Sequence, residues 1–383
     1  MPKPSAPPQS PSQTELAIVG GGLSGLLLGV ACAAEGIETV VIDRQAPAAM
    51  TGGSYDGRTT AVAYGSQQVL SGIGVWPALA PQAEPIREIR VADGGSPLFL
   101  HYDHRELGDA PLGVIGCERD AGSAHLALSH GRSLRAALVI GADGRNSPLR
   151  EGAGIRAFRK DYGQTAIVCT VRHEMPHRGV AVEHFRSAGP FAILPMQNDR
   201  SSIVWTERSA DAQRILALGA AGFQRALANR FGDHLGALAI EGERWSYPLS
   251  LMHAERYTAP RLALIGDAAH VIHPIAGQGW NLGVRDVAAL AELLVDAARL
   301  GLDLGAQSLL ERYERWRRVD NLTLTAVTDG LNRLFTIEAP PVRLVRDLGL
   351  AAVNRAPLAK RFLMRHAMGV VGDLPRLLRG AAL

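Results

Sequence analysis

The chain has 383 residues, of which 47% are hydrophobic and 20% charged, as expected for a soluble globular protein of two or three domains. Its formal net charge of +3 is too small to predict nucleic-acid binding. Its three cysteines show neither a C-x-x-C motif nor a zinc spacing, so we expect no metal site and a reducing compartment. No apolar run reaches the roughly 18 residues of a membrane span. We therefore expect a cytoplasmic protein.

Residues 1–14 are rich in proline, serine and glutamine and lack the apolar core of a signal peptide, so we expect a disordered tail. A strand, a glycine turn, a helix and a second strand are predicted next. The turn fits G-x-G-x-x-G. Gly20 permits the tight turn, Gly22 lets the backbone approach a pyrophosphate, and Gly25 lets helix and strand pack closely. Asp43 ends the second strand and can bind a ribose, which predicts a dinucleotide site and leaves NAD and FAD both open.

A further apolar strand is predicted over residues 136–140. It ends in the sequence GADGRNSPLR, in which Asp143 is followed by several polar residues. Ligands of open α/β sheets collect at the carboxyl ends of strands. The segment is therefore either another part of the binding site or an ordinary Asp-Gly turn.

Residues 165–207 show a different pattern from the parts before them. Short alternating apolar segments are separated by turns at Gly189-Pro190 and Asn198-Asp199, which is typical of an antiparallel sheet. Helical segments are expected over residues 211–231. This region is predicted to form a second domain.

The stretch GDAAHVIHPIAGQGWNLGVRD, residues 266–286, follows a predicted strand over residues 261–265. Asp267 would lie at the end of that strand, where its carboxylate can accept a hydrogen bond from a sugar or ribityl hydroxyl. A loop with a proline and two glycines then leads into a helix predicted over residues 281–300. Bare N–H groups at such a helix N-terminus suit developing negative charge, which a reduced flavin carries.

These three motifs, in this order, resemble those of the FAD-dependent aromatic hydroxylases, monooxygenases with the para-hydroxybenzoate hydroxylase-like fold. Within that superfamily the chain is most similar to the ubiquinone-biosynthesis hydroxylases. The similarity lies in the late motif and in three further segments, DGRTTAV, ERYERWRRVDN and LGLAAVNRAPLAKRFLMRHAMG. It covers essentially the whole chain after the tail.

The resemblance implies an α/β fold. A Rossmann-type FAD-binding domain of the glutathione-reductase kind would be interleaved with an antiparallel-sheet substrate domain and followed by C-terminal helices. The FAD-binding domain is expected over residues 15–75, 117–160 and 255–325, the substrate domain over 76–116 and 161–254, and the C-terminal helices over 326–383.

The resemblance also implies which residues contact the cofactor. Contacts to the pyrophosphate, the adenosine ribose and the neighbouring phosphates would come from Gly20, Gly22, Gly25, Asp43, Arg44 and Arg58. Asp143 is associated with both FAD and pyridine-nucleotide contact. Contacts to the ribityl chain and the flavin ring would come from Gly266, Asp267, Pro274, Gly277, Gln278, Gly279, Asn281 and Leu282. His273 and Pro274 would lie nearest the chemistry.

The implied reaction is hydroxylation of a prenylated phenol in ubiquinone biosynthesis, in which reduced FAD adds O₂ to give a C4a-hydroperoxide. The cofactor performs this chemistry, and the protein binds, orients and excludes water. The electron donor would be transiently bound NAD(P)H or another protein. Two alternatives stay open: a flavin reductase or dehydrogenase of the same fold, and a degenerate, non-catalytic subunit of a quinone-biosynthesis complex.

Between Leu100 and Asp143 the chain is shorter than the family pattern. Gly116-Cys117 leads almost directly into the hairpin that precedes Asp143, so a helix, a strand and their turns, roughly 25 to 35 residues, are expected to be absent. In the family that helix packs beside the FAD. Its absence is expected to weaken cofactor binding.

The sequence allows two interpretations of each of three features: the two histidines of the late motif, Trp280 and the C-terminal segment. His270 and His273 either guide protons at the flavin or form hydrogen bonds that shape the loop, the interpretation we favour. Trp280 either narrows the substrate cavity or packs under the sheet. Residues 341–383, with eight Arg or Lys and two Asp, form either a basic surface for the inner membrane face or a partner, or a solvated face on core helices.

Overall fold

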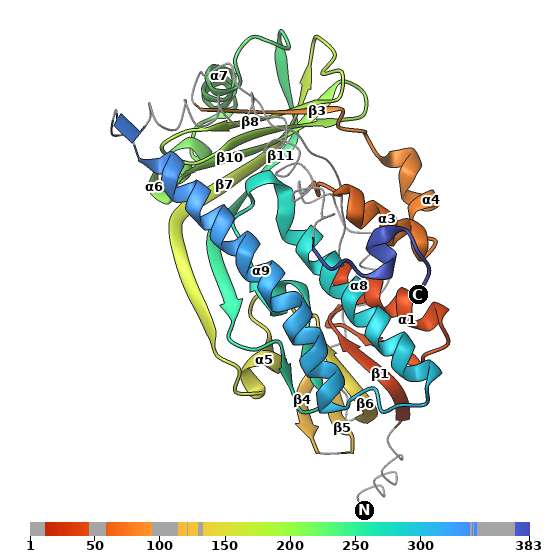
Figure 1. The fold of residues 1–383 in the computed structure, drawn as a ribbon. Helices are drawn as coiled ribbons and strands as arrows, with labels where there is room; N and C mark the ends of the chain where they lie inside the picture. Colours follow the sequence, from red (N-terminus) through yellow and green to blue (C-terminus); the bar gives the residue numbers. More distant parts are fainter. Residues whose placement is uncertain are drawn as a thin grey trace, which may run out of the picture.

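The computed structural model describes residues 12–45, 59–93, 114–120, 122–128, 133–337, 339, 341–342 and 372–383. Within them the chain forms two seven-stranded sheets, each with its own hydrophobic core. Figure 1 shows the two sheets at opposite ends of the molecule, joined by the long strands β7 (Ala157–His173) and β11 (Leu238–Ala254). The arrangement is the α/β fold with an interleaved antiparallel sheet that the sequence predicts.

The first sheet has the strand order β12-β13-β6-β1-β2, with the hairpin of β4 and β5 attached to β6. Its parallel strands are β1 (Ser12–Val19), β2 (Thr39–Ile42), β6 (Ser133–Gly141) and β13 (Leu262–Leu264). The antiparallel additions are β4 (Val114–Arg119), β5 (Ala124–Leu128) and β12 (Thr258–Ala259). The ends of β1 and β6 and all of β13 are buried apolar runs, as parallel strands covered on both faces must be.

Helices α1 (Leu23–Ala34) and α8 (Gln278–Arg299) pack on each other and belong to the core of the first sheet. Both have the alanine- and leucine-rich composition of buried helices. The strand–helix–strand unit predicted after the tail is confirmed, with the second strand over residues 39–42 as expected. The late helix begins at Gln278, three residues before the predicted start.

The second sheet has the order β14-β11-β7-β10-β9-β8-β3 and is antiparallel except for the pairing of β3 with β8. Its other strands are β3 (Glu88–Asp93), β8 (Val180–Phe185), β9 (Phe191–Met196), β10 (Arg200–Arg208) and β14 (His270–Val271). Aromatic and aliphatic side chains of α6 (Ser209–Leu216) and α7 (Ala220–Phe231) cover it. The antiparallel sheet and the helices predicted over 211–231 are confirmed.

Helix α9 (Gln307–Thr336) is 30 residues long and runs from the first sheet to the second (Figure 1). The remaining helical elements are short. They are α3 (Tyr64–Gly72), α4 (Trp76–Leu79), η1 (Ala80–Gln82), α5 (Pro148–Gly152), η3 (Gly266–Ala268), η4 (Ile275–Gly277) and η5 (Arg376–Arg379).

Several predicted domain boundaries fall inside continuous helices or strands. Strand β1 begins at Ser12, within the segment expected to be disordered to residue 14. Strand β4 crosses the expected boundary at 116 and pairs in the first sheet, while β7 begins four residues before the expected boundary at 160. Helix α9 runs unbroken through the boundary at 325. A hydrogen-bonded strand or helix extends as one unit, so boundaries taken from family motifs do not mark its ends.

Candidate active site

The three motifs lie at the carboxyl ends of three adjacent parallel strands. In the strand register Val19 pairs with Gly141, and Gly141 pairs with Leu264. The backbone continues these ladders beyond the strands, because Ala142 N–H donates to Val19 C=O at 2.8 Å and Ile265 N–H donates to Gly141 C=O at 3.0 Å. The glycine turn, the Asp143 turn and the Gly266-Asp267 turn are thereby held side by side at the edge where ligands bind in such sheets.

The three glycines of the first turn serve different purposes. A Cβ at Gly20, whose φ is +110°, would lie 2.2 Å from the Ala142 carbonyl oxygen, and a Cβ at Gly25 would lie 1.9 Å from the Gly20 carbonyl oxygen. A Cβ at Gly22 would meet nothing within 4 Å. Gly22 is also the N-cap of α1, which has no side-chain cap. The fold itself therefore requires Gly20 and Gly25, whereas Gly22 keeps open the space in front of a helix N-terminus that suits a pyrophosphate.

The Asp43 carboxylate contacts the glycine turn. Its carboxylate accepts hydrogen bonds from Gly21 N–H at 2.6 Å and from Gln45 N–H at 3.1 Å. Arg44 beside it is exposed. Arg58, predicted to reach the FAD phosphates, lies outside the described residues.

The middle motif connects directly to the late one. Asp143 accepts a hydrogen bond from Leu149 N–H at 3.1 Å, and burial raises the pKa of its carboxyl. Arg150 is 1% exposed, and its guanidinium donates to Ala268 C=O at 2.9 Å and to Arg145 C=O at 3.1 Å. A buried arginine that satisfies carbonyls of both turns fixes their relative position.

The turn after β13 presents Asp267 at the surface. Gly266 and Ala268 on either side are buried, whereas Asp267 is exposed. Gly266 has a φ of +56°, and a Cβ there would lie 2.9 Å from Ser24 Oγ of α1. The turn that carries Asp267 therefore lies against the first turn of α1, close to its N-terminus.

The N-terminus of α8 is a second open helix end. Its N-cap, Gly277, has the left-handed φ of +60° and provides no side-chain cap, and a Cβ there would lie 2.7 Å from Ala61 Cβ. A Cβ at Gly279 would meet nothing within 4 Å. The loop thus leaves backbone N–H groups accessible at a helix N-terminus, as the predicted flavin site requires.

Asn281 has a different part from the one predicted. Its Oδ1 accepts from Ala63 N–H at 2.9 Å and from Ser66 Oγ at 2.8 Å, and its Nδ2 donates to Ala61 C=O at 2.8 Å and to Gly277 C=O at 3.1 Å. An amide has two acceptor sites and two donors, so none remains for a cofactor. The side chain instead ties the segment after the DGR motif to the flavin loop.

Three other residues, in the first turns of α8, are partly or fully buried. Leu282 is fully buried and Gln278 is 2% exposed, so any cofactor contact there would come from the backbone. Trp280 is half-buried and packs against the core of the first sheet, which favours the packing interpretation of this residue. Pro274 is exposed.

A buried ionic network lies behind the late motif, and no sequence pattern predicts it. Asp286, fully buried, accepts hydrogen bonds from Gly266 N–H at 3.1 Å, His270 Nε2 at 2.6 Å, Arg317 Nε at 2.9 Å and Asn321 Nδ2 at 3.1 Å. Burial acts to raise the pKa of Asp286, but His270 and Arg317 together hold it well below its usual range. His270 therefore helps shape the loop, in agreement with the interpretation favoured from sequence.

The network continues into α9. Arg317 donates to Asp320 at 2.8 Å, and Arg285 of α8 donates to both oxygens of Asp320 at 3.1 Å. The Arg-Asp pair at the end of the late motif and the Arg-Arg-Val-Asp-Asn run in α9 were the available signal, but sequence spacing alone does not show that they meet.

His273 is the most enclosed polar side chain at the junction of the loop, β7 and α9. It is fully buried, and its Nε2 lies 3.3 Å from Gln164 Oε1, which also accepts from Asn332 Nδ2 at 3.1 Å. The ring of Tyr162 meets it edge-on with centroids 5.0 Å apart. Burial lowers the pKa of His273 to about 4, so the ring is neutral at pH 7. It can position a polar group but holds no spare proton at neutral pH.

This buried histidine predicts acid sensitivity. The unfolded state takes up a proton near pH 6.5, whereas folded His273 does so only near pH 4, as does His253. Stability should therefore fall as the pH drops from about 6.5 to 4, by an order of 1–3 kcal/mol per histidine. Urea unfolding measured across this range checks it. His273→Gln should remove part of the slope, and an unchanged slope in that variant would contradict the assignment.

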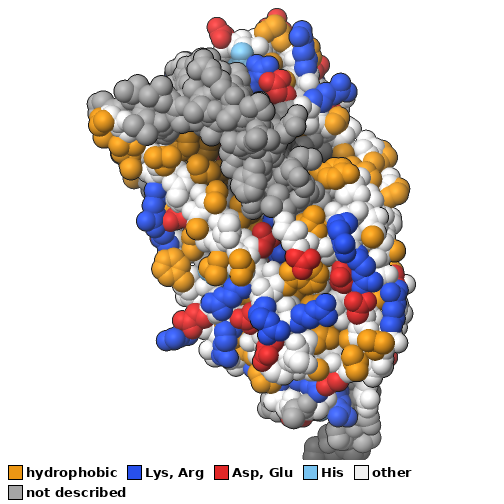
Figure 2. Space-filling view, in the orientation of Figure 1, with side chains coloured by type: hydrophobic (Ala, Val, Ile, Leu, Met, Phe, Trp, Pro, Cys, Tyr) orange, Lys and Arg blue, Asp and Glu red, His pale blue; other side chains and the backbone are white. Residues whose placement is uncertain are grey.

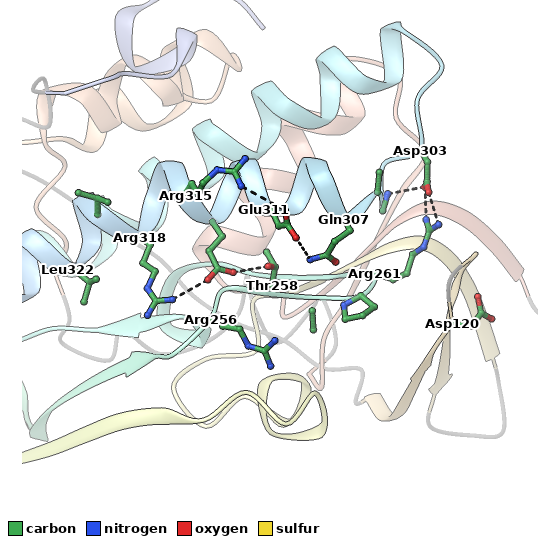
Figure 3. A pocket seen from close by; sticks show the side chains of 16 residues that line it. Asp120, Arg256, Thr258, Arg261, Asp303, Gln307, Glu311, Arg315, Arg318 and Leu322 are labelled. Carbon is green, nitrogen blue, oxygen red and sulfur yellow. Dashed lines mark hydrogen bonds and ion pairs between the residues drawn. The ribbon is translucent and has the colours of Figure 1, made fainter.

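A surface cavity of about 1330 Å³ lies between α9 and the β12 edge of the first sheet (Figure 3). Arg318 pairs with Glu314, and Arg261 pairs with Asp303 at its far end. None of the predicted FAD-binding residues that the structure describes lines it. The cavity is therefore separate from the candidate active site.

Known proteins match both the sequence and the fold. The family described as FAD binding domain matches residues 13–115 and 117–324. The chain is 50% identical over 400 aligned positions to ubiquinone hydroxylase UbiL of Rhodospirillum rubrum, covering 96% of this chain and 93% of the relative. It is 34% identical over 388 positions to 3-demethoxyubiquinol 3-hydroxylase of Escherichia coli, covering 93% and 99%.

The chain belongs to the FAD-dependent hydroxylase family of ubiquinone biosynthesis. It is accordingly an oxidoreductase, with FAD as its cofactor and a small phenolic molecule as its substrate. The solved structure of p-nitrophenol 4-monooxygenase PnpA from Pseudomonas putida DLL-E4 has the same fold, with a TM-score of 0.77 at 18% identity over 94% of this chain and 99% of that one. Within the described residues, none of the helices has the length and apolar composition needed to cross a membrane.

The alignment also bears on the shortened segment. The match to the Rhodospirillum rubrum hydroxylase spans 400 positions, and 96% of this chain's 383 residues is about 368, so about 32 positions face no residue of this chain. The family match is itself interrupted between residues 115 and 117. Both findings agree with the 25 to 35 residues expected to be absent near Cys117.

The first sheet shows a corresponding gap. Among the described residues, β2 is the last strand on its side of the sheet. On the neighbouring helix α1, Leu26 and Val30 are 37% and 41% exposed, one turn apart. Apolar side chains exposed beside an edge strand are consistent with the absence of a covering helix.

Proposed function

We propose that this chain is an FAD-dependent monooxygenase that hydroxylates the aromatic ring of a prenylated phenol in ubiquinone biosynthesis. One observation carries the proposal: two helix N-termini without side-chain caps, at Gly22 of α1 and Gly277 of α8, belong to helices that both contact the turn bearing the exposed Asp267. A dinucleotide with an acidic pyrophosphate, a hydroxylated chain and a ring that becomes anionic on reduction matches this arrangement. The relatives are named as ubiquinone hydroxylases, which supports the substrate class.

The residues divide the binding of FAD among them. The N-terminus of α1 at Gly22 would face the pyrophosphate, Asp43 the adenosine ribose, and Asp267 the ribityl chain. The N-terminus of α8 would stabilise negative charge on the ring. When bound, FAD supplies the electron transfer and oxygen chemistry that no side chain can perform. Arg44, Arg58 and Asp143 stay predicted contacts.

The second sheet and α9 would enclose the substrate. His273, neutral and buried beside Gln164, would orient a polar group of the phenol, and the enclosure of this junction would exclude water. Electrons would come from NAD(P)H bound transiently or from a protein donor, since the described residues contain one parallel sheet with a glycine fingerprint. Contact with a membrane surface or a quinone-biosynthesis complex would deliver the prenylated substrate.

Labelled oxygen tests the proposed reaction. The purified chain with FAD, NAD(P)H and a prenylated phenol is incubated under ¹⁸O₂, and the product is analysed by mass spectrometry. We expect one labelled oxygen atom in the ring hydroxyl. Substrate-dependent oxidation of NAD(P)H without label in the product would favour a reductase, and failure to retain any FAD would favour the non-catalytic subunit.

Asp267→Ala is expected to reduce flavin retention at least tenfold, because it removes the carboxylate that would bind the ribityl hydroxyls at the exposed turn. Flavin absorbance per protein after desalting measures the effect. Asp233→Ala, at an exposed acid of the second domain, is the matched control and should retain FAD normally. Equal retention by both variants would refute the assignment of the late motif.

A further inference from the structure

Helix α9 carries an exposed apolar stripe along its second half. The large members are Val319, Leu322, Val327, Leu334 and Ile337, whose exposed fractions are 70%, 43%, 48%, 39% and 44%. With 3.6 residues per turn, they fall on one face of the helix within an arc of about 140° and over a length of about 27 Å. Exposed apolar side chains that form a continuous patch, unlike scattered ones, indicate an interaction surface.

The stripe differs sharply from the rest of the same helix. The preceding turns expose Glu311, Arg312 and Arg315, whereas Arg333 is the one charged residue classed as exposed from Val319 to Ile337 within the described part of α9. Arg333 is paired with Asp329 at 2.7 Å. In Figure 2 hydrophobic side chains follow the course of the second half of α9, and charged ones gather around the first half. The charge pattern excludes a role as an ordinary solvated face for this part of the helix.

The middle of the stripe is made of small residues. Ala326 and Gly330, one turn apart, are exposed between the large side chains. A Cβ at Gly330 would meet nothing within 4 Å, so no contact within this chain requires glycine there. Glycine in a helix interior is destabilising relative to alanine. A small residue retained at an open position is explained if another helix approaches closely at this point.

The stripe also shows a partial self-match about the level of Thr328, a residue whose own side chain is buried on the opposite side of the helix. Counting outward in both directions, Ala326 lies level with Gly330, Val319 with Ile337, Leu322 with Leu334, and Val327 with Asp329. If a second α9 lies antiparallel across a two-fold axis at this level, Ala326 faces Gly330 at the centre and Val319 faces Ile337 at both ends, because the members of each pair also lie on the same side of the helix. A two-fold interface requires this kind of self-matching surface.

Charge placement agrees with the same arrangement. In this register Arg333 lies level with Thr323 and beside Leu322 of the other copy, and the two Arg333 side chains are separated by ten residues, about 15 Å along the helix axis. That distance exceeds the screening length of roughly 8 Å at physiological ionic strength. No like charges of the stripe are therefore brought together.

We propose that this stripe is the contact surface between two copies of the chain, with α9 packed antiparallel on its symmetry mate about a two-fold axis at Thr328. The contact centres on one pair of helices, which indicates an interface at the small end of the range and a dimer that dissociates on dilution. The proposal is independent of the proposed reaction, because none of the stripe residues is assigned to FAD or substrate.

Sedimentation velocity of the full chain with FAD, from about 1 to 100 µM, measures the monomer–dimer equilibrium. We expect dimer to form with rising concentration. Ala326→Glu and Gly330→Arg should each raise the dissociation constant at least tenfold, since each inserts a charged side chain twice at the closest approach. Both substitutions are at exposed helical positions with good helix formers, so the monomer should stay folded.

Mixing the two variants gives the sharpest test. In a mixed pair the new carboxylate at position 326 lies opposite the new guanidinium at position 330, while the other crossing keeps Gly330 against Ala326. An equimolar mixture should therefore dimerise although each variant alone does not. Ala228→Arg, at an exposed position of α7, is the control and should leave the equilibrium unchanged.

Three results would overturn the proposal. They are a wild-type chain that stays monomeric throughout the range, dimerisation unaffected by Ala326→Glu and Gly330→Arg, and a mixture that stays monomeric. Flotation with anionic phospholipid vesicles is measured in parallel. Vesicle binding by a monomeric wild-type chain that Ala326→Glu abolishes would assign the stripe to a membrane surface instead.

Discussion

Arg317→Met is expected to lower the free energy of unfolding by about 3–5 kcal/mol. Arg317 is 3% exposed and donates to Asp286, Asp320 and Asn321, so its removal leaves Asp286 fully buried with one cationic partner fewer. The cost of an uncompensated buried charge exceeds any gain from the apolar replacement. Because the free energy of unfolding of a typical protein is roughly 5–15 kcal/mol, this one substitution would remove a large part of it. Urea unfolding with matched m-values measures it.

Arg315→Met is the control on the same helix. The Arg315 side chain is 71% exposed and lies 3.8 Å from Glu311, the geometry of a weak surface ion pair. Its loss should change the stability by no more than about 0.5 kcal/mol. If the two methionine variants unfold at the same urea concentration, the buried network does not hold α8 and α9 together as inferred.

Gly22→Ala is expected to separate folding from cofactor binding. The added Cβ would meet no protein atom within 4 Å, and the φ of −67° suits any residue, so the apoprotein should lose under about 1 kcal/mol, the cost of a poorer N-cap. The methyl group would, however, occupy the space proposed for the pyrophosphate. FAD affinity should fall at least tenfold, about 1.4 kcal/mol, in a titration of the apoprotein followed by flavin fluorescence.

Substitutions of two other glycines are controls for the Gly22 variant. Gly25→Ala would place a Cβ 1.9 Å from the Gly20 carbonyl oxygen and should destabilise the apoprotein itself. Gly152→Ala, at the end of α5 and with no atom within 4 Å of its Cβ, should affect neither property. Unchanged FAD affinity in the Gly22 variant would show that the pyrophosphate does not bind at the N-terminus of α1.

The sequence predicts those features that depend on local pattern. Residues 39–42 form an apolar segment after a predicted helix and Gly36, and they form β2 as predicted. The G-x-G-x-x-G spacing identifies a turn in which glycine is required sterically at positions 20 and 25. Asp267 is correctly placed at the end of a strand because acid and strand are adjacent in the chain. The cofactor contacts themselves stay predictions.

The sequence does not predict features that depend on distant segments meeting. Asn281 looks like a cofactor ligand in its motif, yet its four hydrogen-bonding sites are taken by residues 61–66 and Gly277. Asp286 and Arg317 are 31 positions apart, and neither periodicity nor composition indicates that α8 and α9 bury this pair. The lengths of β7 and α9, which run across the predicted domain boundaries, are likewise set by packing on both sheets.

The buried Asp286 cluster also restricts how this protein can change over generations. A single substitution of Asp286, Arg317 or Asn321 would leave the remaining polar groups buried without a partner. The cost would be comparable to the free energy of unfolding of the whole protein. Acceptable alternatives exist only when several members are replaced together by a packed apolar set. We therefore expect these positions to be inherited as a block among related hydroxylases, either all retained or all exchanged.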